Sequence, residues 1–438
     1  MNWKTLFELE QSESSTTYRS RFDRDFDRII FSHPFRRLQD KTQVHPLPEY
    51  DFVHNRLTHS LEVSSVGRSL GRAVGQQVIE KHQDLRGLID PNDFGTVVAS
   101  AALAHDIGNP PFGHSGESSI SDFFKEQESK FVKEFTSEEW ADLCSFEGNA
   151  QGFRLIAKSG QDGLKLTLPT IAAFTKYPRP AKVLDRMKGR RSQKKFGFYE
   201  SEKETYITMA KGLELKALSV NQWVRHPLAF LVEAADDVCY NIIDLEDGCN
   251  LGLVSTEETI ALLARILGNK FKPEKLETIP LIKDKVGLLR ALAIGELISQ
   301  CVEQFMANEE AILAGTYDRS LTDDIKSKDV LNDIVSVSIE KIYRSAKVVE
   351  IEAAGYRVLN GLLEVFVPAI FAKHYDELGY REKLYWRLIP KDYTMLIERE
   401  KSLYGKLRVL LDFISGMTDS YAVNLHRKIN GTTLPGMH

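Results

Sequence analysis

The sequence predicts an all-α fold for this chain of 438 residues. Apolar residues recur three and four positions apart over long stretches, with charged residues between them. Alternation of apolar and polar residues, which is typical of strands, is scarce. We therefore expect helices within residues 60–82, 97–108, 227–247 and 330–366.

Clusters of proline, glycine and asparagine mark the connections between these helices. We expect loops at residues 45–51, 108–116, 176–182 and 429–438. Residues 196–210, FGFYESEKETYITMA, are the one segment in which we expect a small β-hairpin. The rest of the chain should be helical.

The composition limits the class of protein. Hydrophobic residues make up 42% of the chain, which is enough for a large core. The formal net charge of −5 argues against a protein that coats nucleic acid, because such proteins usually carry a strong basic excess. A local basic patch is compatible with this charge, so nucleic-acid binding is left open without being predicted. The four cysteines form no CxxC pair, which suits a reducing compartment and predicts neither a disulfide nor a cysteine-bound metal.

The N-terminal segment MNWKTLFELEQSESS carries acidic residues where a signal peptide would have its apolar stretch. No uncharged apolar run approaches the roughly 20 residues that a membrane span requires. We therefore expect a cytoplasmic protein with no membrane partner.

The segment LAHDIGNPPFGHSGE, residues 103–117, ends an alanine-rich helical stretch. Its glycines and prolines account for the end of the helix, but they do not account for His105, Asp106 or the later His114. A His–Asp pair on its own is most often a buried histidine that hydrogen-bonds a carboxylate. Polar residues elsewhere in the chain must decide whether this segment is a reaction centre.

Two further segments place polar side chains in apolar helices. RLTHSLEV puts His59 at the start of an amphipathic helix, and VEAADDVCYNIIDLED puts Asp236 and Asp237 inside another. Carboxylates are rarely buried without a compensating cation. Two imidazoles and two carboxylates from three helices would make a mixed nitrogen and oxygen site for one divalent ion. Manganese, magnesium, nickel, iron and zinc all suit this ligand set.

The pattern of His59, His105–Asp106 and Asp236 resembles the HD phosphohydrolase superfamily. More of the chain resembles the bacterial deoxyguanosinetriphosphate triphosphohydrolase family, in the segments HDIGNPPFGHSGE, FEGNAQGFR, KYP, EAADDVCYNIIDLED and ISGMTDSYA. The long motif from HD to GHSGE is specific, whereas the bare HD doublet is not.

This resemblance implies a helical HD-domain core followed by a C-terminal helical extension. We place the core, with its metal and triphosphate site, at residues 1–250. A C-terminal helical subdomain at residues 251–438 would complete the pocket and make oligomer contacts. The resemblance also implies that four residues bind the metal ion: His59, His105, Asp106 and Asp236.

His114 and Glu117 match the catalytic pair of the family. Residues three apart share a face of a helix, so Glu117 would orient His114 and stabilise its charge. The alternative is that His114 merely belongs to a turn. Asp237 follows the position that matches the metal ligand, and it should point elsewhere on its helix.

The sugar of the substrate would lie along the helix that carries Asp236. Asp236, Tyr240 and Asp244 follow at intervals of four residues and form one stripe. A phenol ring can pack on a sugar, and a carboxylate can accept a hydrogen bond from its hydroxyl. The resemblance implies that these positions, with Gln43 and Val44, contact the deoxyribose. The plainer alternative is a tyrosine at the rim of the core and an aspartate in a surface ion pair.

Three residues are implied as phosphate contacts: Arg56, Asn109 and Lys195. Lys195 belongs to a basic segment, residues 176–195, that contains nine Lys or Arg against one acid. Such a segment is usually a solvated surface loop. Next to an anion site it would instead attract phosphates.

The implied activity is a metal-dependent hydrolysis of dGTP, or of other deoxynucleoside triphosphates, to the deoxynucleoside and inorganic triphosphate. An HD nucleotidase or phosphodiesterase for nucleoside monophosphates or cyclic nucleotides is the alternative. A third reading is a protein that senses nucleotides or binds single strands without turnover. Because members of the family form homo-oligomers, commonly hexamers, we expect an oligomer, with a nucleotide as a candidate activator.

Overall fold

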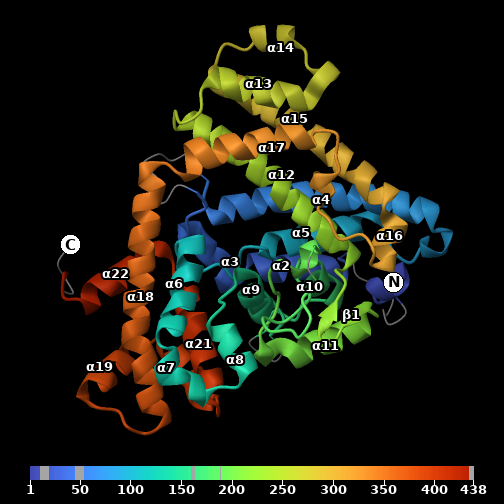
Figure 1. Cartoon of the computed structure of the whole chain (residues 1–438). Helices are drawn as coiled ribbons and strands as arrows, with labels where there is room; N and C mark the ends of the chain where they lie inside the picture. Colours follow the sequence, from blue (N-terminus) through green and yellow to red (C-terminus); the bar gives the residue numbers. More distant parts are fainter. Residues whose placement is uncertain (10–18, 45–53, 159–162, 188, 434–438) are drawn as a thin grey trace.

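The computed structural model describes residues 1–9, 19–44, 54–158, 163–187 and 189–433, and the expected all-α fold is confirmed (Figure 1). Its described strands are β1 (Ala217–Ser219) and β2 (Gln222–Trp223), which form one antiparallel hairpin. The expected loop at 45–51 and the last five residues of the expected tail lie outside the described residues.

Three helices form the centre of the molecule: α4 (Arg56–Lys81), α5 (Pro91–Ala104) and α12 (Pro227–Asn250). α4 and α5 approach closely because α4 carries glycines on the contact face. A Cβ atom at Gly71 would lie 2.7 Å from the carbonyl oxygen of Phe94, which is too close for any other residue. The closeness of these helices brings the histidines at their ends together.

The ends of α4 and α5 follow from local sequence. The Asn55 side chain accepts from the Thr58 backbone N–H, so α4 begins at Arg56 and carries His59 in its first turn. α5 begins after an Asp90 cap and ends at His105, just before the Gly108 and Pro110 turn. Both histidines therefore lie at the helix ends that face each other.

The expected hairpin at residues 196–210 is wrong. This segment forms η6 (Glu200–Glu202) and most of α11 (Lys203–Gly212), and the hairpin follows it. The buried residues Tyr206, Met209 and Leu213 are spaced as on one helix face, which favours a helix over a strand here. Asn221, with φ of 58°, makes the tight turn of the actual hairpin.

The long helix expected within residues 330–366 is interrupted. α17 (Lys328–Val337) continues into a π-helical turn, η9 (Ser338–Tyr343), and α18 (Ala346–His374) starts after Ser345. The apolar spacing continues on both sides of the break, so periodicity alone does not reveal it. The break turns Tyr343 towards α12, where it stacks on Tyr240 with ring centroids 5.7 Å apart.

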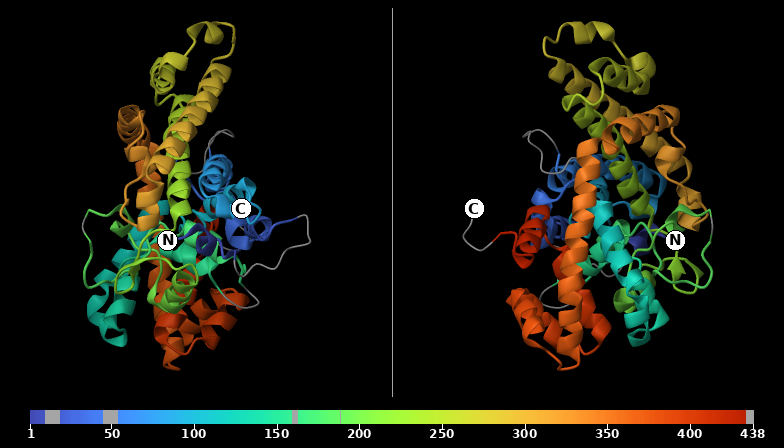
Figure 2. Two further views of the ribbon diagram at one scale, coloured as in Figure 1. Left: turned by 90° about the vertical axis from the view of Figure 1, so that its right-hand side faces the viewer. Right: turned by 60° about the vertical axis from the view of Figure 1, so that its left-hand side comes forward.

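Around the central helices, the N-terminal half contains α1 (Trp3–Leu6), α2 (Arg21–Ile30), α3 (His33–Arg36), η2 (Arg37–Asp40), η3 (Gln83–Leu85), α6 (Gly113–Glu126), α7 (Glu128–Phe131), η4 (Val132–Glu134), α8 (Ser137–Leu143), α9 (Gly148–Ile156), α10 (Leu168–Phe174) and η5 (Arg191–Gln193). The C-terminal half adds α13 (Thr256–Leu267), η7 (Gly268–Lys270), α14 (Pro273–Glu277), α15 (Ile282–Ala307), α16 (Glu309–Ala314), η8 (Leu321–Asp323), α19 (Tyr380–Leu388), α20 (Lys391–Arg399), α21 (Leu403–Ser415) and α22 (Asp419–Ile429). Helices α13, α14 and the adjoining end of α15 project from the body as an arm (Figure 2).

Two hydrophobic clusters hold these helices together. The larger one joins the central helices to α15 and α17. The second joins α6 and α8 to α18 and α21, so the start of the GHSGE helix rests on the C-terminal helices. The division at residue 250 stays a prediction.

α18 is the one described helix whose length and composition would suit a membrane span. However, 56% of its most apolar window is buried inside the protein, as in a core helix. It packs against α6, α21 and α22, and it forms the long edge of the molecule in Figure 1.

Candidate active site

The facing ends of α4 and α5 and the middle of α12 border a cavity of about 430 Å³. Twelve of the thirteen residues that the sequence nominated for the site line it: Gln43, Val44, Arg56, His59, His105, Asp106, Asn109, His114, Glu117, Lys195, Asp236 and Tyr240. Asp244 is the exception, because it is buried behind the wall.

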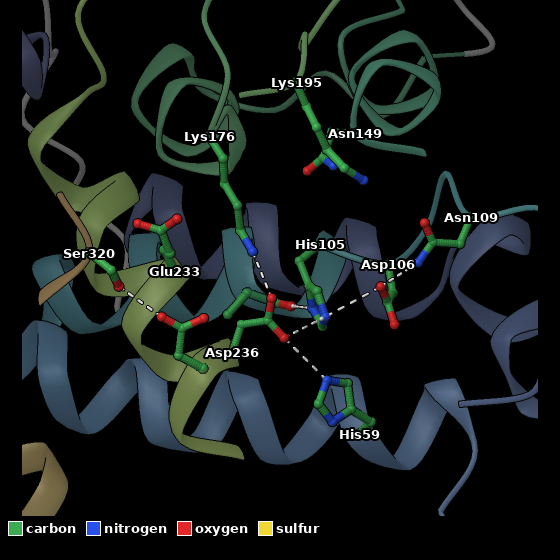
Figure 3. Close-up of polar contacts among 12 residues, drawn as sticks. His59, His105, Asp106, Asn109, Asn149, Lys176, Lys195, Glu233, Asp236 and Ser320 are labelled. Atoms are coloured by element: carbon green, nitrogen blue, oxygen red, sulfur yellow. Dashed lines mark hydrogen bonds and ion pairs between the residues drawn. The ribbon is translucent and has the colours of Figure 1, made fainter. Parts of the chain in front are cut away.

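The four nominated metal ligands converge on one point (Figure 3). Donor atoms of His59, His105 and Asp106 all lie within 4.8 Å of one another. The Oδ1 atom of Asp236 lies 3.3 Å from His59 Nε2 and 3.5 Å from His105 Nε2. Nitrogen and oxygen donors at this spacing could hold one divalent metal ion.

The backbone fixes the orientation of His105 for such a role. Its Nδ1 lies 2.7 Å from the carbonyl oxygen of Ala102, which can only accept a hydrogen bond. The proton must therefore be on Nδ1, and the lone pair of Nε2 faces the other ligands. A histidine that binds a metal is commonly held by a second hydrogen bond of this kind.

The two carboxylates at this point each have a cationic partner. Arg56 donates to Asp106 Oδ2 at 2.8 Å, and Lys176 donates to Asp236 Oδ2 at 2.7 Å. Burial opposes ionisation of Asp106, but Arg56 and the neighbouring histidines outweigh it and lower its pKa to about 2. The remaining oxygen of each carboxylate faces the histidines.

Asp237 bonds residues outside this cluster, as its place on the helix predicts, and one of them is Ser320, which is labelled in Figure 3. Its Oδ2 accepts from the hydroxyls of Ser320 and Thr322, at 2.8 and 2.7 Å. Burial and the nearby Glu233 raise the pKa of Asp237 to about 6. Its role is to pair α12 with the 320–323 segment.

His114 and Glu117 occupy the first turn of α6. Phe112 and Gly113 have φ angles of 61° and 57°, and this sharp turn directs His114 into the cavity. His114 Nε2 lies 3.9 Å from Glu117 Oε2, and the His114 side chain is 84% exposed. Although the side chain is open to the cavity, the protein around it disfavours the charged imidazolium, and the charges of Lys195 and Arg56 add to this effect, so the pKa of His114 is lowered.

Glu117 is held by the start of α9. Its Oε1 accepts from the Gly148 backbone N–H at 2.7 Å. A Cβ atom at Gly148 would lie 2.9 Å from Glu117 Oε1 and 2.2 Å from Asn109 Oδ1, so a larger residue here would displace both side chains. Burial and the negative charge of Glu147 raise the pKa of Glu117 to about 7.

Glu147 in turn positions Lys195. The Lys195 ammonium lies 3.1 Å from Glu147 Oε1, which also accepts from the Asn149 side chain at 2.7 Å. Lys195 thus reaches the cavity wall opposite the metal cluster (Figure 3).

The wall along α12 is aromatic. Tyr240 stacks on Tyr343, and the Tyr343 hydroxyl donates to Asp244 Oδ2 at 2.6 Å. Burial raises the pKa of Asp244 to about 7. On the opposite side Gln43 contributes a buried Oε1 atom that has no hydrogen-bond partner among the described residues.

The basic segment 176–195 is mostly engaged within the protein. Arg179 and Arg186 donate to the carbonyl oxygen of Gln193, and Arg191 pairs with Glu233 at 2.9 Å. Among its described cations, Lys176 and Lys195 line the cavity. The segment is therefore mainly a folded wall, with two cations available to an anion.

Several lining residues were missed by the sequence analysis: Glu147, Asn149, Lys176, Tyr177, Tyr343, Val348 and Glu352. The segments around Glu147 and Lys176 were noted as motifs, but nothing in their spacing assigned a role to these side chains. Tyr343 lies about 100 residues beyond α12, the helix it faces, and neither Tyr343 nor Glu352 had a local signal.

Comparisons with known proteins identify the class of protein. The HD domain family matches residues 56–147, which include three of the clustered metal-ligand candidates. The phosphohydrolase-associated domain family matches residues 329–428. The fold and site are thus those of an HD-domain hydrolase.

Full-length relatives narrow this class. The chain is 38% identical over 455 residues to a deoxyguanosinetriphosphate triphosphohydrolase-like protein of Synechocystis sp., covering 99% of this chain and all of the relative. A protein of the same name from Pseudomonas aeruginosa is 36% identical over 99% of this chain and all of its own length. The deoxyguanosinetriphosphate triphosphohydrolase of Salmonella paratyphi A is 30% identical over 93% of both chains. This chain belongs to the deoxyguanosinetriphosphate triphosphohydrolase-like family.

Proposed function

We propose that the protein hydrolyses deoxynucleoside triphosphates, with dGTP preferred, to the deoxynucleoside and inorganic triphosphate. One observation carries the proposal: a single cavity joins the four-ligand cluster, the His114–Glu117 pair and the Tyr240 wall. A site for hydrolysis of the α-phosphate ester needs these three parts, one for phosphate, one for a proton and one for a sugar. The names of the relatives support the substrate class.

His59, His105, Asp106 and Asp236 would hold a divalent metal ion. Manganese, magnesium, nickel, iron and zinc are the candidates, and such an ion supplies charge neutralisation at phosphate and activation of water. The donor set fits because each carboxylate directs one oxygen to the histidines while its other oxygen bonds Arg56 or Lys176.

The cations of the cavity would bind the triphosphate. Arg56 and Lys176 lie beside the ligand cluster, and Lys195 extends from the opposite wall. Three cations that converge on one cavity favour a polyanion over a monophosphate. Asn109 donates to Asp106 and lies between these groups, where its amide could reach a phosphate oxygen.

His114 would deliver a proton to the 5′-oxygen of the leaving deoxynucleoside. Its exposure in the cavity leaves Nε2 free to approach a substrate atom. Glu117 would support the charged imidazolium from behind, because Gly148 fixes its carboxylate. Lys195 and Arg56 disfavour protonation of His114. The negative charge of a bound triphosphate would offset these cations and favour the protonated imidazole.

The deoxyribose would pack on Tyr240, between that ring and the Gln43–Val44 segment. Close packing there would exclude a 2′-hydroxyl, and Gln43 Oε1, which has no hydrogen-bond partner among the described residues, could accept from a sugar or base donor. Asp244 would act on the 3′-hydroxyl if Tyr343 releases it. Glu352 of α18 lines the cavity, and a carboxylate there can accept from the N1–H and 2-amino groups of guanine.

The test is chromatographic product analysis with a panel of deoxynucleotides and ribonucleotides, repeated with several metals. We expect triphosphate and deoxyguanosine from dGTP, with slower turnover of GTP. Release of pyrophosphate or orthophosphate from dGTP would contradict the bond assignment. Faster turnover of monophosphates or cyclic nucleotides would favour a nucleotidase or phosphodiesterase, and binding without turnover would favour a sensor.

We also propose that the chain acts as a homo-oligomer, with a hexamer favoured, in the cytoplasm, and that a nucleotide can activate it. The exposed Leu281 and Ile282 of the projecting arm, 61% and 58% exposed, support a contact between copies. Light scattering after size exclusion, with and without mixed nucleotides, measures the state. A monomer under both conditions would contradict this proposal.

A further inference from the structure

We propose that Asp419, at the start of α22, positions His114 for catalysis from outside the cavity. The inference rests on the proposed function of the His114–Glu117 pair and deepens it. Asp419 is a positioning residue, because it does not line the cavity and acts through the turn that precedes His114. It connects the C-terminal helices to the reacting groups.

The Asp419 carboxylate joins two segments that enter the cavity. Its side chain is buried, with the residue 2% exposed. Oδ2 accepts from the Thr42 backbone N–H at 2.9 Å and from the Thr42 hydroxyl at 2.6 Å. Oδ1 accepts from the Phe112 backbone N–H at 3.0 Å. One carboxylate therefore fixes the distance between the Gln43 segment and the His114 turn.

The turn at Phe112 needs such support. Phe112 has a left-handed backbone, with φ of 61° and ψ of 18°, which is unfavourable in a residue other than glycine. Its ring packs on Gly355 of α18, where a Cβ atom would lie only 2.3 Å from Phe112 Cγ. The hydrogen bond to Asp419 and this ring contact hold the turn from two sides.

Lys41 holds the other end of the loop that precedes His114, residues 109–112. Its buried ammonium donates to the carbonyl oxygen of Asn109 at 2.6 Å and to that of Ser415 at 2.8 Å. The loop of residues 109–112 is thus tied at both ends to the segments 41–42 and 415–419. Because His114 follows this loop directly, its position depends on these ties.

Helix capping does not account for Asp419. Thr418 already caps α22, since its side chain accepts from the Tyr421 N–H at 3.2 Å. The Asp419 carboxylate instead bonds Thr42 and Phe112, which lie 377 and 307 residues away along the chain.

The test compares Asp419→Asn with wild type in the full-length metal-loaded protein. Asparagine has one acceptor oxygen, so it can serve Thr42 or Phe112 but not both. We expect kcat for dGTP to fall about 10- to 100-fold, as small misplacements of a catalytic group do, with KM and bound metal almost unchanged. Amide hydrogen exchange over residues 110–115 should become faster.

A matched control lies one residue further along. Ser420 also ties α22 to the N-terminal segment, through its hydroxyl and Asp40 Oδ1 at 3.0 Å, but it does not touch the Phe112 turn. Ser420→Ala should keep wild-type kcat and wild-type exchange at residues 110–115. Equal losses in both variants would overturn the proposal, because Asp419 would then only dock the helix.

Thr42 gives a second route if Asp419→Asn folds poorly. Thr42→Val removes the hydroxyl contact and should lower kcat a few-fold, while Thr42→Ser should restore it. Unchanged exchange at residues 110–115 in both Asp419→Asn and Thr42→Val would also overturn the proposal. If the wild-type protein releases no triphosphate from dGTP, the proposed function is wrong. Amide hydrogen exchange at residues 110–115 in wild type and Asp419→Asn would still decide whether Asp419 holds the turn.

Discussion

His114 and Asp106 face one cavity but depend on different partners. Asp106 shares its oxygens with Arg56 and the histidine cluster, whereas His114 approaches Glu117. Asp106→Ala should therefore remove bound metal and activity together. His114→Ala should keep the metal and lower kcat by about 10²- to 10⁴-fold. Elemental analysis of the purified variants, combined with dGTP turnover, measures both quantities.

A suitable control is His33→Ala, because His33 is an exposed histidine of α3. It should change neither metal content nor kcat. Loss of metal from His114→Ala would contradict the separation of the two roles.

His54 makes a pH-dependent contribution to stability. Its Nδ1 lies 2.9 Å from Asp247 and its Nε2 lies 3.2 Å from Glu62, so one imidazolium bridges α12 and α4. Burial opposes protonation, but these two carboxylates outweigh it and raise the pKa of His54 to about 10. Between pH 6.5 and 10 the folded state holds a proton that the unfolded state has lost, so stability falls as pH rises.

We expect His54→Asn to destabilise the protein on the order of 3 kcal/mol below about pH 6.5. The difference from wild type should shrink as pH rises through 10. Urea unfolding of both proteins at pH 6, 8 and 10 measures it. A difference that stays constant with pH would contradict the charged bridge.

Side chains with an intrinsic signal could be nominated from the sequence. His105–Asp106 is an unusual pair at a helix end, and Asp236 is a carboxylate in an apolar helix, so local context alone distinguishes both. Lys176 has no such signal, because the loop that carries it has no periodicity and its partner Asp236 lies 60 residues away. Contacts of that range depend on the path of the loop, which local sequence does not specify.

At the scale of elements, α9 supports the proposed catalytic pair, His114 and Glu117. Gly148→Ala would place a methyl group 2.2 Å from Asn109 Oδ1 and 2.9 Å from Glu117 Oε1. Both side chains would have to move, so we expect kcat to fall at least about 10-fold and unfolding free energy to fall by about 1–3 kcal/mol. Steady-state kinetics and urea unfolding test this expectation.

Gly295 of α15 is the matched control, since a Cβ atom there meets no atom within 4 Å. Gly295→Ala should leave kcat unchanged and add up to about 1 kcal/mol of stability through helix propensity. Equal kinetic effects in the two variants would argue against a specific role of Gly148.

Helices with strong periodicity were predictable, and their interruptions were not. Residues 330–366 have apolar spacing throughout, yet the π-helical turn and Ser345 divide them, and Tyr343 at this break bonds Asp244 of α12. Residues 196–210 show the opposite error, since a hairpin was expected where the spacing of Tyr206 and Met209 favours a helix. In both segments, tertiary packing and not local sequence preference determines the secondary structure.

At the scale of the whole molecule, the negative charges of the proposed metal-binding carboxylates are balanced by cationic side chains of the protein. Arg56 and Lys176 pair with Asp106 and Asp236, so removal of a metal would not leave unpaired buried carboxylates. We expect protein treated with EDTA to keep its far-ultraviolet circular dichroism and lose its activity. Its Tm should then rise with added manganese, by an amount equivalent to about 2.7 kcal/mol at 100 times the Kd.

Unfolding on chelation would contradict this prediction. Metal-dependent folding of the whole chain would then be the better description. Magnesium titration on the same sample distinguishes a specific ion from a general effect of divalent cations.

The overall arrangement could be predicted only in outline. Helical content followed from periodicity, but the position of α18 and α22 against the HD core did not, because their contacts join residues more than 200 positions apart. Such contacts also explain why Glu352 and Asp419 were not nominated for the site.

The hydrogen bond between Thr42 and Asp419 can form only after nearly the whole chain has been translated. The ribosome makes Thr42 377 residues before its partner, which corresponds to about 20–75 s at 5–20 residues per second. During that interval a nascent chain can already contain all four metal-ligand candidates, yet its Phe112 turn has no carboxylate to hold it. An unfinished chain should therefore bind metal before it can degrade nucleotides, so catalytic competence arrives late in translation.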